Sequence, residues 1–183
     1  MKRDKRMMLR LCMGIFIVAA VVMSTTGTGT AQTQEVLSYA AKFVCFTGNA
    51  LAVVPGTYLT TINIHNPHTL PVTIKKKAVL ALPERASRGE ISPFVTETLG
   101  PDEAMGVDCK DIKGLFPKPP VSFIEGFVVI QVAPQANFQT APELDVVGVY
   151  TAKHRTGTDI NDPKKYDVES IDVKEYSPKK ILQ

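Results

Sequence analysis

The segment Phe123–Ala133 constrains the fold of this chain more than any other stretch. It reads Phe-Ile-Glu-Gly-Phe-Val-Val-Ile-Gln-Val-Ala and is rich in the β-branched and aromatic residues that favour strands. Both of its alternating sets are apolar: Ile124, Val128, Ile130 and Val132 on one side, and Phe123, Phe127 and Val129 on the other. A strand that is apolar on both sides is expected to be covered on both sides and to lie centrally in its sheet. We therefore expect a central strand here, with the other strands laid around it.

The first 31 residues have the order of a secretory signal peptide. Five basic residues and one acid precede an apolar run of 13 residues, Leu11–Met23, and a small polar tail ends at Ala31. The run is short for a membrane-spanning helix, which needs about 20 residues. We expect a signal-peptide helix over residues 1–31 that is cut between Ala31 and Gln32, with contact to the membrane only through this segment. An uncleaved anchor is the alternative.

Removal of this segment changes the charge of the protein. The whole chain has 21 Lys and Arg against 18 Asp and Glu, whereas Gln32–Gln183 has 16 against 17. A net charge of −1 gives no support to nucleic-acid binding, which needs a basic face. The sequence therefore predicts an exported protein, periplasmic or extracellular, that does not bind nucleic acid.

The remaining residues, 32–183, form a single domain by length. Eight segments have the apolar pattern of strands: Val36–Phe46, Thr57–His65, Leu70–Leu82, Phe94–Leu99, Ala104–Cys109, Phe123–Ala133, Leu144–Ala152 and Ser170–Tyr176. Turns rich in Gly, Pro, Asn and Asp separate them, and no helical period is sustained. The spacing predicts an all-β fold, an antiparallel immunoglobulin-like β-sandwich of about eight strands, with a closed barrel as the alternative.

Several segments carry local expectations. Thr47–Asn49 reads as a turn, and Lys110–Phe116 as a single helical turn. The run Lys75–Lys77 indicates a sheet edge, where lysines block pairing with other molecules. Residues 153–169 are polar without a hydrophobic period, and residues 177–183 form a basic tail, so neither is expected to contribute a strand.

Three parts of the domain carry a resemblance to known proteins. They are Thr98–Pro101 leading to Val107–Ile112, then Leu144–Ala152, then Ser170–Val173. These segments resemble small exported bacterial β-sandwich proteins of uncharacterised function. The resemblance implies the same fold and compartment, and it implies no activity and no site residue.

Two cysteines, Cys45 and Cys109, remain after the signal peptide. In an oxidising compartment they allow one disulfide, which would close a loop of about 64 residues. The bond requires their two strands to be neighbours. Two buried free thiols are the alternative.

Histidine is the first candidate for metal chemistry. His65-Asn66-Pro67-His68 places two imidazoles around a turn, where they could bind Cu or Zn if His154 or Asp145 came near. The alternative is a pair of solvated histidines at the end of a strand.

Other chemical motifs fail on their spacing. Read as a calcium loop from Asp159, the sequence has Lys164 where glycine is needed and Ser170 where glutamate is needed. There is no Gly-x-Ser-x-Gly, no Cys-x-x-Cys and no phosphate-binding glycine loop. We therefore expect no catalytic residues, no cofactor and no enzyme activity.

What remains is a binding or structural role in the bacterial envelope or periplasm. The expected partner is a protein or an envelope component, contacted through the end loops 134–143 and 153–169. Phe138, in the first of these loops, is either an exposed contact residue or a plug over the end of the sandwich. A Cu or Zn protein using His65 and His68 is the alternative. A carbohydrate-binding module is a further one, which the absence of tryptophan disfavours.

Overall fold

Most of the described chain is β-sheet. The computed structural model describes residues 35–50, 53–120, 123–155 and 166–182. Within them lie nine strands and one short helix: β1 (Glu35–Ala50), β2 (Val53–His65), β3 (Val72–Leu80), β4 (Val95–Leu99), β5 (Ala104–Asp108), α1 (Cys109–Gly114), β6 (Ile124–Val132), β7 (Asp145–Arg155), β8 (Tyr166–Glu175) and β9 (Lys179–Leu182). The predicted all-β class is confirmed, while the predicted signal peptide lies outside the described residues. No helix in these ranges has the length and hydropathy needed to cross a membrane.

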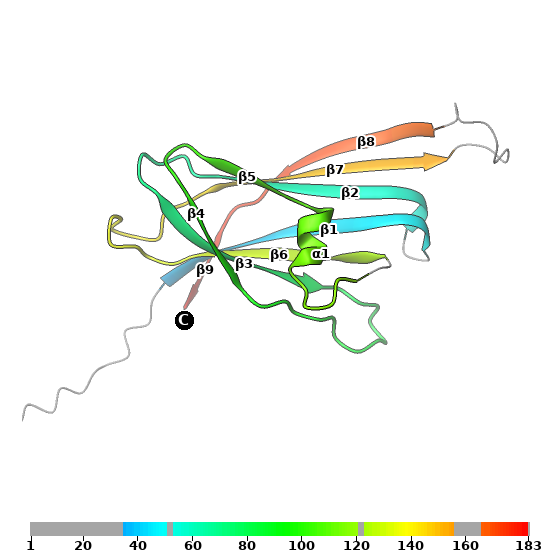
Figure 1. Cartoon of the computed structure of the whole chain (residues 1–183), viewed down its shortest axis with the longest axis horizontal. Helices are drawn as coiled ribbons and strands as arrows, with labels where there is room; N and C mark the ends of the chain where they lie inside the picture. Colours follow the sequence, from blue (N-terminus) through cyan, green and yellow to red (C-terminus); the bar gives the residue numbers. More distant parts are fainter. Residues whose placement is uncertain (1–34, 51–52, 121–122, 156–165, 183) are drawn as a thin grey trace, which may run out of the picture. The chain divides into compact units, whose positions relative to one another are not determined.

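All nine strands belong to one sheet, and all their pairings are antiparallel (Figure 1). The order is β4-β3-β6-β1-β2-β7-β8, with β5 paired to β2 and β9 paired to β1. We call β4, β3, β6, β9 and the first part of β1 the first branch, and β5, β2, β7 and β8 the second branch. Buried side chains from both branches and from α1 form one core cluster, which includes Tyr39, Phe43, Ile62, Ile74, Val107, Ile112, Val128, Ile130 and Val146.

The strand expected at the centre, β6, lies between β1 and β3. Its predicted inner side is buried, and this side comprises Ile124, Val128, Ile130 and Val132. The prediction that both sides are covered is wrong, because Phe127 on the other side is 40% exposed. The ammonium group of Lys42 lies 5.6 Å from the centre of the Phe127 ring. A lysine on the neighbouring strand therefore shields this ring in place of a second layer.

The lysine run Lys75–Lys77 does not mark a sheet edge, so that prediction is wrong. β3 pairs with β4 on one side and with β6 on the other. Along β3 the core-facing residues alternate with outward ones, and Lys76 takes a core-facing position with 6% exposure. Its ammonium lies 3.1 Å from Glu97 on β4. The lysine that interrupts the apolar pattern is thus an inward ion-pair partner.

Besides shifts of up to four residues at the ends of other strands, three strand boundaries differ from the prediction. The expected turn Thr47–Asn49 lies inside β1, where a bulge between Gly48 and Ala50 shifts the register against β2. Gly48 has φ of +128°, a conformation that glycine adopts without a steric penalty. β8 begins at Tyr166 within the segment expected to be polar loop, and β9 lies in the basic tail. Both are outer strands of the sheet, which are held by backbone pairing and need no apolar period.

β1 is shared by the two branches, and side chains complete its hydrogen bonding where it parts from β2. The hydroxyl of Thr60 accepts from the backbone N–H of Val44 and donates to the Val44 carbonyl, both at 3.0 Å. The Tyr176 hydroxyl accepts from the N–H of Lys42 at 3.1 Å, and the Tyr150 hydroxyl donates to the Lys42 carbonyl at 2.6 Å. The N–H and carbonyl groups of Lys42 and Val44 thus form hydrogen bonds with three side chains, in place of the hydrogen bonds that a neighbouring strand would provide.

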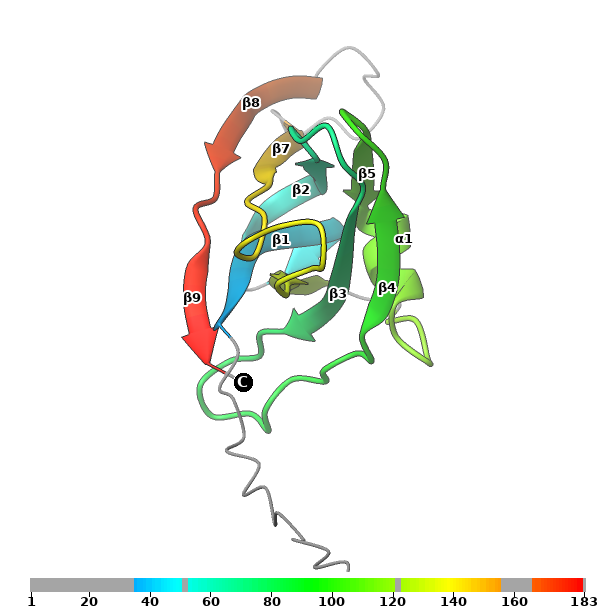
Figure 2. The same cartoon turned by 90° about the vertical axis from the view of Figure 1, so that its left-hand side faces the viewer.

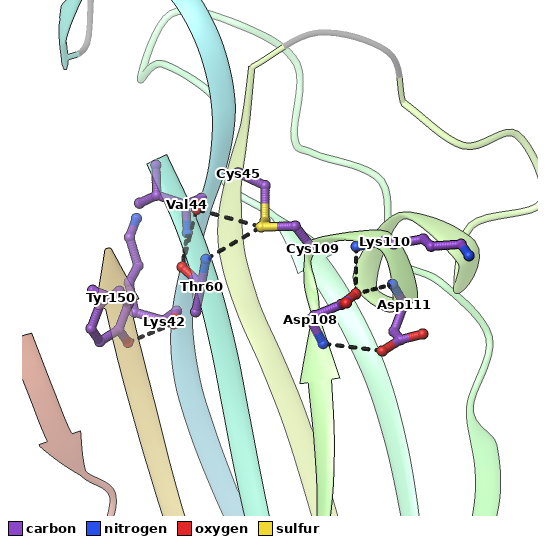
Figure 3. The surroundings of a disulfide bond; sticks show 9 residues. All are labelled: Lys42, Val44, Cys45, Thr60, Asp108, Cys109, Lys110, Asp111 and Tyr150. Atoms are coloured by element: carbon purple, nitrogen blue, oxygen red, sulfur yellow. Dashed lines mark hydrogen bonds between the residues drawn. A yellow bond between two sulfur atoms is a disulfide. The ribbon is translucent and has the colours of Figure 1, made fainter. Parts of the chain in front are cut away.

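A disulfide ties this part of β1 to the only helix of the described residues (Figure 3). It joins Cys45, the last residue of β1 paired to β6, to Cys109, the first residue of α1, with 5.6 Å between their Cα atoms. The predicted helical turn is confirmed and is capped by Asp108, whose side chain accepts from the N–H groups of Lys110 and Asp111. These hydrogen bonds, that from Asp111 first, lower the pKa of Asp108. The bond and the cap together fix α1 against the core.

Replacing Thr60 tests the role of side chains in completing β1. Thr60 is 1% exposed, and Thr60→Val would remove the hydroxyl that bonds the part-buried N–H and carbonyl of Val44. We expect this change to lower the free energy of unfolding by about 2 to 4 kcal/mol, measured by urea denaturation. Thr60→Ser keeps the hydroxyl and loses one methyl group, so its expected cost is about 1 kcal/mol. Equal costs for the two variants would contradict the hydrogen-bond account.

The disulfide can be tested by a double substitution, Cys45→Ala with Cys109→Ala. Loss of a bond that spans 64 residues is expected to lower the free energy of unfolding by roughly 4 kcal/mol, because the unfolded chain regains its freedom. Urea denaturation provides the measurement. The wild-type protein in a reducing buffer is the control and should match the variant, whereas an unchanged midpoint in both would refute the assignment.

Candidate functional site

Loops from three parts of the chain meet at the end of the sheet where β2 ends and β7 begins, and Figure 2 looks onto this end. Asn66, which is fully buried, connects two of them. Its side-chain amide donates to the carbonyls of Leu70, at 2.9 Å, and Gly100, at 2.7 Å. Its backbone N–H donates to the carbonyl of Glu103 at 2.9 Å. A residue predicted only to form a turn is therefore the internal support of the site.

His65 bridges two carboxylates at this end. Its Nδ1 lies 2.9 Å from Asp145 and its Nε2 lies 3.0 Å from Asp102. Asp145 is the first residue of β7, and Asp102 belongs to the turn between β4 and β5 with φ of 56°. Asp tolerates this left-handed conformation better than most residues. One imidazole thus links strand ends from β2 and β7 to a turn.

The two carboxylates raise the pKa of His65, and the hydrogen bond from Asp145 contributes most, followed by that from Asp102. A raised pKa means that the folded state favours the imidazolium form. The stabilisation from this bridge is therefore fully present below the ordinary pKa of histidine. It is lost as the pH rises through the raised value.

The loop 134–143 is held to the body of the domain at both of its ends. Near its start, the Gln135 side chain accepts from the N–H of Thr73 at 2.9 Å and donates to the Thr73 carbonyl at 3.1 Å. Near its end, Nε2 of His68 lies 2.7 Å from the carbonyl of Glu143. Phe138 packs against the core and against the ring of His68, with 5.2 Å between ring centres. Of the two interpretations of Phe138, the structure supports the plug.

The surface of this end is acidic and exposed. We call it the end surface and define it by four carboxylates and the exposed residues of the loop tip: Asp102, Glu103, Glu143, Asp145, Ala136, Asn137, Gln139 and Thr140. The side chains of Asp102 and Asp145 are 90% and 57% exposed, and that of His65 is 35% exposed. The four carboxylates outnumber the two histidines, so the side chains that define this surface carry a net negative charge.

The sequence gives a Cu or Zn site at His65 and His68 as the alternative to a pair of solvated histidines. In the structure, both ring nitrogens of His65 face carboxylates and Nε2 of His68 faces a backbone carbonyl. Within residues 35–50, 53–120, 123–155 and 166–182, no group of three or more His, Cys, Asp or Glu side chains is placed to hold a metal ion. The metal site stays a prediction. The acidic loop that begins at Asp159 and the end loop 153–169 lie largely outside the described residues.

The carboxylate partners of His65 were not found from the sequence as a set. The sequence indicates Asp145 only as a possible metal ligand, and no motif singles out Asp102. The available signal was weak, because the two aspartates lie 37 and 80 residues from His65 in the chain.

Comparison of the chain with protein-family models, curated proteins and solved structures gives no match. The resemblance to exported β-sandwich proteins therefore stays a prediction.

The bridge at His65 predicts a titration that NMR can follow. We expect the imidazole of His65 to titrate above the ordinary pKa of about 6.5. Asp145→Asn should lower this pKa most, and Asp102→Asn should lower it less, because asparagine cannot offer a negative charge. Asp172→Asn on β8 is a control that should leave it unchanged. A pKa of His65 at or below the ordinary value would show that the bridge does not form in solution.

Proposed function

We propose that this protein is an exported, non-enzymatic binding domain that contacts a protein or envelope component through its end surface. One observation carries the proposal: Asn66, His65, His68 and Gln135 fix loops from three parts of the chain in one arrangement. Fixed loops present their exposed groups without a further loss of conformational freedom on binding. Binding sites commonly lie on loops that a rigid scaffold positions in this way.

The proposed fold is an immunoglobulin-like sandwich in which the two branches are two layers. The supporting observation is that buried side chains of both branches meet in a single core cluster, with Tyr39 and Ile130 from the first branch and Ile62 and Val146 from the second. Antiparallel strands connected by turns are typical of this architecture.

Export is supported by two independent features. The first 31 residues have the pattern of a signal peptide. The bond between Cys45 and Cys109 persists best in an oxidising compartment, such as the periplasm or the extracellular space. Together they favour a protein that acts outside the cytoplasm.

The absence of catalysis is part of the proposal, and it is supported by how the reactive groups are used. The imidazole of His65 is held by carboxylates at both nitrogens. The sulfur atoms of Cys45 and Cys109 are bonded to each other. These groups therefore serve as structural links in the folded protein.

The charge of the end surface indicates the chemistry of its partner. Exposed carboxylates at Asp102, Glu143 and Asp145 favour a partner with lysine or arginine side chains at its contact surface. Such an interaction weakens as ionic strength rises, because salt screens exposed charges.

The proposal can be tested by recovering the partner from an envelope extract on the immobilised protein. The test variant combines Asp102→Asn, Glu143→Gln and Asp145→Asn. Each change removes charge and keeps the size of the side chain, and the two aspartate changes also weaken the bridge to His65. We expect recovery of the partner to fall strongly with this variant and to fall with added salt for the wild type.

A matched control removes three exposed carboxylates elsewhere, through Glu84→Gln, Glu90→Gln and Glu175→Gln. It should retain the partner at the wild-type level. Equal recovery by the test and control variants would refute the role of the end surface. Circular dichroism of each variant verifies that the fold is kept.

A further inference from the structure

A second site lies away from the end surface, between β4, β5 and α1, which Figure 2 shows near one another. Here the side chains leave an open pocket of about 540 Å³. Its size falls within the range of about 300 to 1,000 Å³ that is usual for small-molecule sites. Part of its wall is apolar and consists of Val95, Met105, Val107 and Leu115.

Lys76 lines this pocket and is the feature that points to a ligand. Its side chain is only 8% exposed, whereas that of its partner Glu97 is 42% exposed. An ammonium group has three N–H donors. In the described part of the chain, Lys76 has a hydrogen bond to Glu97 at 3.1 Å and to no other residue. Two donors of a buried cation therefore remain for a group that enters the pocket.

The other charged groups of the pocket are Glu97, Asp111 and Lys110. Oε1 of Glu97 is taken by Lys76, and one carboxylate oxygen of Asp111 accepts from the backbone N–H of Asp108 at 3.1 Å. Lys110, from the first turn of α1, adds a second ammonium group to the wall. N–H donors of the two lysines are therefore available to a ligand, whereas Glu97 and Asp111 each already accept a hydrogen bond through one carboxylate oxygen. This arrangement favours an anionic group on the ligand.

The apolar part of the wall specifies the rest of the ligand. Val107 is buried, Met105 and Leu115 are half-buried, and Val95 is 37% exposed. Covering these side chains with an apolar group removes their surface from water and favours binding. A ligand that is anionic at one end and apolar along its body matches both parts of the pocket.

We propose that this pocket binds a small carboxylate with an apolar body and that Lys76 holds the carboxylate. In the empty pocket the neighbouring Glu97 carboxylate pairs with this ammonium group, so it competes with the ligand for it. The site is independent of the partner contact at the end surface, since the two share no residue.

Octanoate is the probe, and its binding to the full-length protein is measured by isothermal titration calorimetry. We expect saturable binding of octanoate. The alcohol 1-octanol, which lacks the charge, should bind at least about tenfold more weakly, and octylamine should not bind. Binding of octylamine as tight as that of octanoate, or no saturable binding of octanoate up to about 10 mM, would overturn the proposal.

Three substitutions separate ligand recognition from a purely structural ion pair. Lys76→Met keeps the length of the side chain and should weaken octanoate at least about tenfold while leaving 1-octanol unchanged. Lys75→Met, at the adjacent outward position of β3, is the matched control and should bind octanoate like the wild type. Glu97→Gln removes the competing charge and should tighten octanoate binding, which a structural role of the ion pair does not predict. Unchanged octanoate affinity in both Lys76→Met and Glu97→Gln would assign the pair to stability alone.

Discussion

The structure depends on a single long strand that changes its neighbours along its length. The first part of β1 pairs with β6 and β9, and its last residues pair with β2. A strand that leaves one neighbour before it gains another exposes backbone polar groups inside the protein, which is costly unless they are bonded. The hydroxyls of Thr60, Tyr150 and Tyr176 meet this requirement at Lys42 and Val44.

The same few residues couple the hydrogen bonding of β1 to the position of α1. The backbone N–H of Thr60 donates to Sγ of Cys109 at 3.3 Å, and Cys109 is bonded to Cys45. The hydroxyls of Tyr150 and Tyr176 also bond to each other, and burial followed by this hydrogen bond raises the pKa of Tyr150. Tyr150 therefore stays a neutral hydrogen-bonding group over the whole physiological pH range. Strand exchange, disulfide and helix placement form one connected unit.

Much of the fold could be predicted because its central strands repeat apolar residues at every second position. β6, β2 and β7 lie where their patterns place them, and α1 overlaps the predicted helical turn Lys110–Phe116. The outer strands β8 and β9 were not predicted in full. They are held by backbone hydrogen bonds, which do not require apolar side chains at every second position. The alternation of Val72, Ile74 and Ala78 in fact put Lys76 on the core side. The neighbouring lysines led to the wrong prediction, because a run of lysines is typical of an edge strand.

β9 pairs with the beginning of β1, so that Glu35 lies opposite Leu182 and Ser38 opposite Lys179. Adjacent strands are about 5 Å apart, so the chain enters and leaves the folded unit at neighbouring points. A short glycine linker could therefore join these two points, and new termini could be opened in the exposed segment 83–88. A circular permutant of this kind would retain every strand pairing while moving both ends of the polypeptide to a different edge of the molecule.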